Sequence, residues 1–94
     1  MENKKYIGKI VADKESNKLG KIVDIKDIQD NKTKIWKPHM LIRVKRFLRK
    51  DIIILVELSK IIKFDDFHVW LDITKDEFDL EVIETRALMY LMQD

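Results

Sequence analysis

Ile7-Gly8-Lys9-Ile10-Val11 begins with an apolar residue and continues Gly-Lys-Ile-Val, and the same pattern returns in Leu19-Gly20-Lys21-Ile22-Val23-Asp24-Ile25. A short polar segment, residues 13–18, separates the two stretches. Glycine inside a strand usually marks a bulge, a sharp bend or the close approach of another backbone. The pair therefore predicts the first two strands, residues 6–12 and 20–28, of a small and strongly curved β-sheet or barrel.

After these two strands, further strands are predicted up to residue 73. Residues 40–47 alternate between apolar and polar side chains, and residues 67–73 alternate in the same way. Residues 52–56 form a continuous apolar run, which is typical of a strand buried on both faces or of a strand closed into a barrel. Residues 59–64 fit either a helical turn or a bridging strand. One face of residues 67–73 carries Phe67, Val69, Leu71 and Ile73, and the other carries His68, Trp70 and Asp72. Charged turns are expected at residues 49–51 and 65–66.

The C-terminal segment differs in kind, because its apolar residues have helical spacing. Thr74 and Glu77 fit a capping box, in which Thr74 caps the helix and Glu77 reaches back to the backbone N–H of Thr74. An alternative interpretation makes residues 78–82 another alternating strand before a short terminal helix. The capping residues favour the helix.

This predicted helix is apolar on two opposite sides. One side carries Phe78, Val82, Met89 and Met92, and the other carries Leu80, Ile83, Ala87 and Leu91. A helix that is apolar on two sides must be covered on two sides. The chain's own sheet can cover one side, and we expect a partner chain to cover the other.

Length and composition limit the classes of function. Ninety-four residues correspond to one domain, and the chain contains no cysteine, which excludes disulfides and thiolate chemistry. No apolar run approaches a membrane span, so we expect no membrane insertion and a cytoplasmic location. No motif for a nucleophile or a phosphate loop is present. His39 and His68 have no metal-ligand spacing, so we predict no enzyme, no metal site and no cofactor.

The charges are unevenly distributed along the chain. Residues 1–71 carry seventeen Lys and Arg against ten Asp and Glu, whereas residues 72–94 carry two against seven. Such asymmetry is typical of a basic surface that binds nucleic acid, or of two complementary protein surfaces that meet. We therefore expect the basic surface to attract acidic terminal segments, either its own or those of a neighbouring chain.

Two groups of residues are candidates for binding. Cations near an exposed aromatic residue can hold phosphates and stack a base, although a charged strand can equally protect a sheet edge. Trp36, in a predicted loop beside Pro38, and Trp70, on the outward face of its strand, are candidate anchors at an interface. The basic-patch candidates are Arg43, Lys45, Arg46, Arg49 and Lys50. The protein-binding candidates are Trp36, Trp70, Phe78, Val82, Met89, Leu91 and Met92.

The chain resembles the PRC-barrel family, and in particular its small stand-alone archaeal members. The glycine-spaced opening quoted above matches the family's first two strands. The segment Val56-Glu57-Leu58-Ser59-Lys60-Ile61-Ile62-Lys63-Phe64-Asp65-Asp66-Phe67-His68-Val69-Trp70-Leu71 matches its closing pattern. The first turn lacks the usual Asp-Gly pair and has Glu15-Ser16-Asn17 instead. The resemblance implies a mainly β fold, a small barrel of about six strands in residues 1–73. A C-terminal helical extension follows in residues 74–94.

The resemblance also implies a function. Family members act by binding and assembly without a shared catalytic site, and some stand-alone archaeal members take part in cell division. We expect a non-enzymatic adaptor that forms a homodimer or a hetero-assembly with another PRC-barrel or a division protein. The alternative is an RNA- or ribosome-associated module that uses the basic strand 43–50.

Overall fold

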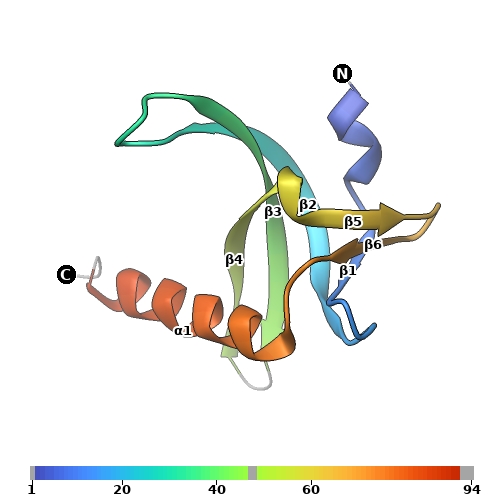
Figure 1. Ribbon diagram of the computed structural model, residues 1–94. Coiled ribbons are helices and arrows are strands. Elements are labelled where there is room, and N and C mark those ends of the chain that lie inside the picture. Colours follow the sequence, from blue (N-terminus) through green and yellow to red (C-terminus); the bar gives the residue numbers. More distant parts are fainter. Residues whose placement is uncertain (1, 47–48, 92–94) are drawn as a thin grey trace.

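The computed structural model describes residues 2–46 and 49–91, and the side chains of residues 3–45 and 50–83 among them. Two short 3₁₀ helices, six strands and one α-helix follow one another along this part of the chain (Figure 1). Their bounds are η1 Glu2–Tyr6, β1 Ile10–Ala12, β2 Lys18–Gln29, β3 Trp36–Arg46, β4 Arg49–Glu57, η2 Leu58–Lys60, β5 Ile61–Phe64, β6 His68–Leu71 and α1 Lys75–Leu91.

All six strands belong to one curved sheet with the order β4-β3-β2-β1-β6-β5. The β1–β6 pair is parallel and the other pairs are antiparallel. The two edge strands, β4 and β5, are consecutive in the chain and are joined by η2. Within the described residues no strand pairing links β4 to β5. The prediction of a mainly β fold with six strands and a C-terminal helix is confirmed, whereas the sheet is not shown closed into a barrel.

The two glycines of the opening pattern serve different purposes. Gly20 lies in β2, and a Cβ atom added to it would come within 2.5 Å of the backbone oxygen of Arg43 and 2.8 Å of a methyl group of Ile42. It therefore allows β3 to approach closely, as the sequence predicts. Gly8 instead lies in a turn between η1 and β1 with φ of 91°. The prediction of a strand from residue 6 was wrong, because this left-handed backbone delays the strand until Ile10.

The core lies on one face of the sheet, where alternate residues of each strand point. Ile22 on β2 and Ile42 on β3 are fully buried, and so are Val69 and Leu71 on β6. On β4, only every second residue is buried, since Ile53 is 38 % and Leu55 is 49 % exposed. The prediction of a strand buried on both faces was therefore wrong for residues 52–56. As an edge strand of an open sheet, β4 has one covered face and one uncovered face.

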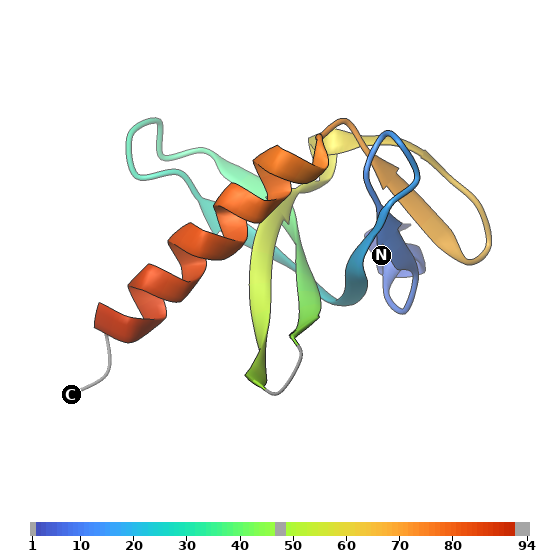
Figure 2. The ribbon, with the colours of Figure 1, turned by 90° about the horizontal axis from the view of Figure 1, so that it is seen from below.

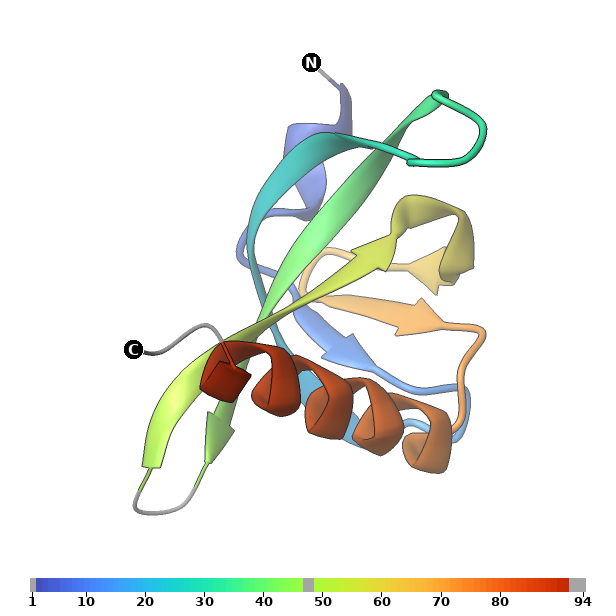
Figure 3. The ribbon, with the colours of Figure 1, turned by 90° about the vertical axis from the view of Figure 1, so that its left-hand side faces the viewer.

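Helix α1 covers part of the core next to β4, as Figures 2 and 3 both show. Its N-terminus has the predicted capping box. The Glu77 backbone N–H donates to Thr74 Oγ1 at 3.1 Å, and the Thr74 backbone N–H donates to Glu77 Oε1 at 3.4 Å. Phe78 is only 2 % exposed and belongs to the core, and Val82 packs against the core. The alternative strand at residues 78–82 was therefore wrong.

The turn between β1 and β2 is built around a buried carboxylate. Asp13 is 1 % exposed, and its Oδ1 accepts hydrogen bonds from the backbone N–H groups of Glu15 and Asn17, at 2.9 and 2.8 Å. Its Oδ2 accepts a third bond from the Asn17 amide at 3.0 Å. Burial opposes ionisation, but these hydrogen bonds outweigh it and hold the pKa of Asp13 below its ordinary value. The Asp13 carboxylate thus ties together the backbone of the turn between β1 and β2.

This lowered pKa predicts acid sensitivity. Hydrogen bonds in the folded state stabilise the ionised form of Asp13, and the unfolded chain lacks them. The ionised carboxylate therefore adds to the free energy of unfolding above about pH 4, and this contribution is lost as the pH falls through the folded-state pKa. We expect the unfolding free energy of the wild type to fall in acid, and Asp13→Asn to make that fall shallower. Urea unfolding at several pH values measures both slopes. Equal slopes for the wild type and Asp13→Asn would contradict the prediction. Hydrogen bonds from backbone N–H groups also lower the pKa values of Asp30 and Asp65, and these two residues account for the pH dependence that remains in Asp13→Asn.

Candidate basic groove

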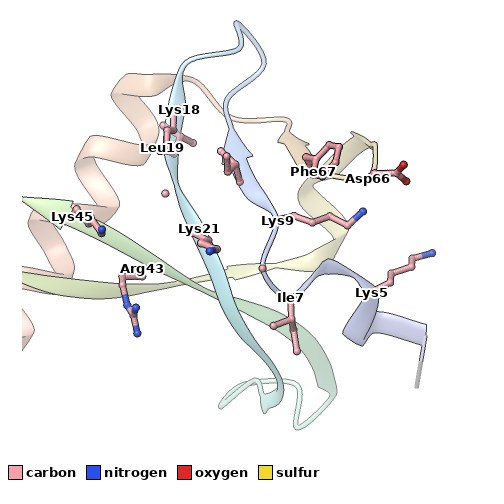
Figure 4. Close-up of a pocket in the computed structure, with 13 residues that line it drawn as sticks. Lys5, Ile7, Lys9, Lys18, Leu19, Lys21, Arg43, Lys45, Asp66 and Phe67 are labelled. Carbon is pink, nitrogen blue, oxygen red and sulfur yellow. The ribbon is translucent and has the colours of Figure 1, made fainter.

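A groove of about 740 Å³ lies on the outer face of the sheet, between β1, β2, β3 and the β5–β6 turn (Figure 4). Its lining combines positive charge with apolar surface, including Ile7, Leu19 and Phe67. We call it the basic groove. The described residues give it six cationic side chains, which are Lys5, Lys9, Lys18, Lys21, Arg43 and Lys45.

Strand alternation places two of these cations, Lys21 and Arg43, opposite the core. Ile22 and Ile42 point into the core, so their exposed neighbours Lys21 and Arg43 point outward into the groove. Lys21 and Arg43 are also directly opposite each other across the β2–β3 ladder. Like charges in such a cross-strand pair destabilise a sheet. Sequences that keep a local conflict of this kind often do so at a functional site.

Little negative charge balances this lining. Asp66 is the one carboxylate among the groove-lining residues that the structure describes. Across residues 2–46 and 49–91, no ion pair involves Lys18, Lys21, Arg43 or Lys45. Four cations on adjacent strands are therefore available to an anionic ligand.

Aromatic rings hold the cations at the end of the groove that is remote from Arg43 and Lys45. The Lys5 and Lys9 ammonium groups lie 4.7 and 5.3 Å from the centre of the Phe64 ring, and Lys9 also donates to the backbone oxygen of Asp65. The Phe64 ring in turn makes a T-shaped contact with Tyr6, with centroids 5.1 Å apart. These contacts hold the two lysines in place while leaving their charge uncompensated.

Phe67 is the exposed aromatic residue of the groove, with 72 % of its surface accessible. The Asp65 carboxylate fixes the turn before it, since Oδ1 accepts from the backbone N–H groups of Phe67 at 2.8 Å and His68 at 2.6 Å. The hydrogen bond from Phe67, followed by that from His68, lowers the pKa of Asp65. The prediction that Phe67 shares a face with the buried Val69 and Leu71 was wrong, because β6 begins only at His68 and Phe67 lies exposed in the turn before it.

The predicted basic patch is divided by the structure. Arg43 and Lys45 lie at one end of the groove, and Phe67 and Lys9 lie at the other (Figure 4). Lys50 is exposed at the beginning of β4 and does not line the groove. The side chains of the remaining two candidates, Arg46 and Arg49, lie outside the described residues. The basic stretch 43–50 is shared by two strands, since β3 ends at Arg46 and β4 begins at Arg49, and the charged turn expected at residues 49–51 was therefore wrong.

Trp36 is 63 % exposed, but it is the first residue of β3 and pairs with Gln29. Its predicted position in a loop was wrong. Residues 36–38 pair with β2 on one side, while the described β4 ladder begins only at His39. The missing N–H of Pro38 is therefore tolerated on the unpaired side. A role for Trp36 in binding stays a prediction.

Trp70 points outward from β6, as predicted, and is partly covered by its own chain. Its indole N–H donates to Ser16 Oγ at 3.2 Å, and the Lys63 ammonium lies 4.6 Å from the centre of the ring. The His68 ring lies beside it, with centroids 5.5 Å apart. The described contacts of Trp70 therefore come from the turn between β1 and β2 and from the β5–β6 hairpin. A role in partner binding stays a prediction.

The C-terminal candidates divide between an inner face and an outer face of α1. Phe78 and Val82 face the chain's own core. The side chains of Met89 and Leu91, and the whole of Met92, lie outside the described residues. On the opposite side, Leu80 is 56 % and Ile83 is 59 % exposed.

The outer face of α1 is acidic as well as apolar. Asp76, Leu80 and Ile83 follow one another at helical spacing, and Glu77 lies beside them. All four side chains are exposed. We define the outer face of α1 by these four residues.

The remaining chemistry of the described residues is sparse. They contain no group of three or more His, Asp or Glu side chains that could hold a metal ion. In the same part of the chain, no helix is long and apolar enough to cross a membrane. Comparisons with protein-family models and with curated proteins found no match to the chain.

Proposed function

We propose that the chain is a non-enzymatic adaptor that acts through protein–protein association. The observation that carries this proposal is the outer face of α1. Leu80 and Ile83 are each more than half exposed, while Phe78 and Val82 on the inner face pack on the core. Adjacent large apolar side chains on a stable helix are typical of an interaction surface. A partner covering this face would complete the two-sided burial that the sequence predicts.

Further support comes from the resemblance to PRC-barrel proteins. Gly20 allows β2 and β3 to approach closely, and the two sheet edges follow each other in the chain through η2. Both features fit a small barrel-like scaffold that presents its outer surface. We therefore propose a PRC-barrel-like adaptor of the cytoplasm, and cell division in archaea as the process it serves.

The test is association of the intact chain. We expect its mass in light scattering to rise above that of a monomer at about 1 mM chain, a concentration that populates contacts worth about 4 kcal/mol. The double change Leu80→Gln and Ile83→Gln removes apolar burial worth roughly 3 kcal/mol and should weaken association about a hundredfold. Truncation at Ile73 is a poorer test, because it also removes Phe78 from the core.

A matched control is available on the rest of the surface. Ile35 and Ile62 are 55 and 54 % exposed, outside α1, so Ile35→Gln with Ile62→Gln makes the same chemical change elsewhere. This control should associate as the wild type does. The immobilised chain should also retain a stoichiometric protein partner from an extract of its source organism if the assembly is heteromeric. A chain that stays monomeric and retains no protein would refute the adaptor function.

A second candidate function is supported by the basic groove. Arg43 and Lys45, from the predicted RNA-binding strand, lie in the groove with Lys21, and exposed Phe67 lies at the other end. A charged groove with an exposed aromatic side chain can hold the backbone of a single strand and stack one of its bases. We therefore keep RNA binding as the rival to protein association.

A further inference from the structure

We infer that the basic groove of one copy of the chain binds the outer face of α1 of a second copy. This inference rests on the proposed adaptor function and specifies its partner and its contact surface. Each copy would then have one donor surface and one acceptor surface, located on different parts of the fold.

The chain cannot make this contact within itself. The groove cations Lys21 and Arg43 lie on the outer face of the sheet, opposite the buried side chains of Ile22 and Ile42. Helix α1 is held on the core side by Phe78. The sheet therefore separates the outer face of α1 from the groove of the same copy, and only a neighbouring copy can bring the two together.

Charge complementarity identifies the occupant. Among the described residues, six cations line the groove against the single carboxylate of Asp66. The outer face of α1 presents Asp76 and Glu77, and residues 72–94 carry seven acidic residues against two basic ones. Opposite potentials on two surfaces speed their encounter and fix their register.

The two surfaces also match in apolar content and size. Phe67 and Ile7 are exposed in the groove, and Leu80 and Ile83 are exposed on the helix. One turn of an α-helix with its side chains occupies roughly 500 Å³, from its pitch and diameter. A groove of about 740 Å³ can therefore seat about one and a half turns, which is the greater part of the roughly two turns from Asp76 to Ile83.

Like charges disfavour the symmetric alternatives. A contact between two outer faces would bring Asp76 and Glu77 of both copies together, and a contact between two grooves would bring the cations of both copies together. The helix-to-groove contact is heterologous, and a heterologous contact builds an open filament or, where the rotation between copies closes, a ring. We therefore expect an assembly of more than two copies, which is larger than the homodimer expected from the sequence.

The experiment uses two variants that each disable one surface. Leu80→Gln with Ile83→Gln disables the helix, and Lys21→Gln with Arg43→Gln disables the groove. The groove changes remove a repulsive cross-strand pair, so the fold should tolerate them. Lys26→Gln with Lys32→Gln makes the same change in net charge outside the groove and serves as its control. Thermal unfolding confirms that every variant is folded.

The expected result is a complementation pattern. The wild type should form species larger than dimers as its concentration rises, and about tenfold weaker association is expected when salt screens the groove. Each disabled variant alone should stay monomeric. An equimolar mixture of the two should form a one-to-one dimer and nothing larger, because only one intact helix and one intact groove meet. Sedimentation velocity resolves these species.

Three results would overturn the inference. They are a mixture that stays monomeric, a disabled variant that assembles like the wild type, and a wild type that is monomeric at the highest concentration. If the mixture stays monomeric or a disabled variant assembles, the adaptor function still holds as long as the wild type associates. If the wild type is monomeric, the adaptor function still holds as long as the chain retains another protein. A fluorescent oligouridylate bound in low salt by a monomeric wild type, and lost in the groove variant, would assign the groove to nucleic acid instead.

Discussion

Phe78→Ala should lower the free energy of unfolding by about 4 kcal/mol, the loss typical of truncating a large buried aromatic side chain. Phe78 is 2 % exposed and is the buried residue through which α1 joins the core. A chain of this size has roughly 0.1 kcal/mol of stability per residue, so the change removes close to half of the total. We expect the helix to detach from the sheet at the same time.

Urea unfolding followed by circular dichroism measures this loss. Leu80→Ala is the matched control, because it truncates a neighbouring apolar residue of the same helix that is 56 % exposed. A surface change of this kind should alter stability by no more than about 0.5 kcal/mol. Similar losses in the two variants would mean that α1 does not pack through Phe78.

Gly20→Ala should cost about 3 kcal/mol, the upper part of the range for overpacking. The added methyl group would lie 2.5 Å from the backbone oxygen of Arg43, and neither of the two paired strands can shift without breaking its ladder. The same change should weaken assembly, because it displaces Arg43 at the wall of the basic groove.

Gly8→Ala separates steric crowding from backbone strain. A Cβ atom at Gly8 would meet nothing within 4 Å, but the residue has φ of 91°. Left-handed backbone costs an L-residue about 1–2 kcal/mol, so Gly8→Ala should be the milder change. Thermal unfolding of the two variants tests the order, and a larger loss at Gly8 would contradict the roles assigned to the two glycines.

Local patterns predicted much of the fold because their causes are local. The capping box at Thr74 and Glu77 is confirmed atom by atom, since both partners lie within one helical turn. The alternation predicted from residue 40 onward is seen in β3, where Met40 and Ile42 are buried and Arg43 is exposed. A close approach at Gly20 is also confirmed, because a glycine inside a strand often marks the place where a second backbone comes near.

The wrong predictions concern features that depend on how distant parts of the chain are arranged in space. The apolar run 52–56 is equally compatible with a central strand and with an edge strand that has one uncovered face, and only sheet order separates them. In the sequence, Phe67 continues the alternation of the strand that follows it. In the structure, its backbone N–H donates to the Asp65 carboxylate, which places Phe67 in the turn. A carboxylate that can bind the backbone N–H two residues later is a turn signal that the sequence already contained.

The basic groove could be predicted only in part. Arg43 and Lys45 stood out as part of a local cluster, but the other cations are scattered through the first third of the chain. The register of three strands brings them together, and Lys21 meets Arg43 only because β2 pairs with β3 in that register. A single sequence does not encode such a register in a readable local pattern.

The parallel β1–β6 pair has a consequence for how the chain acquires its binding surfaces. The β1–β2–β3–β4 meander is built from neighbouring segments, whereas the parallel pairing of β1 must wait for β6, in which His68 pairs with Ile10. Long loops close late because their entropy is lost before their contacts form. During synthesis, the cationic wall on β2 and β3 would therefore exist before Phe67 arrives, and α1 would follow last. Growing chains on a ribosome would thus be protected from premature assembly with one another.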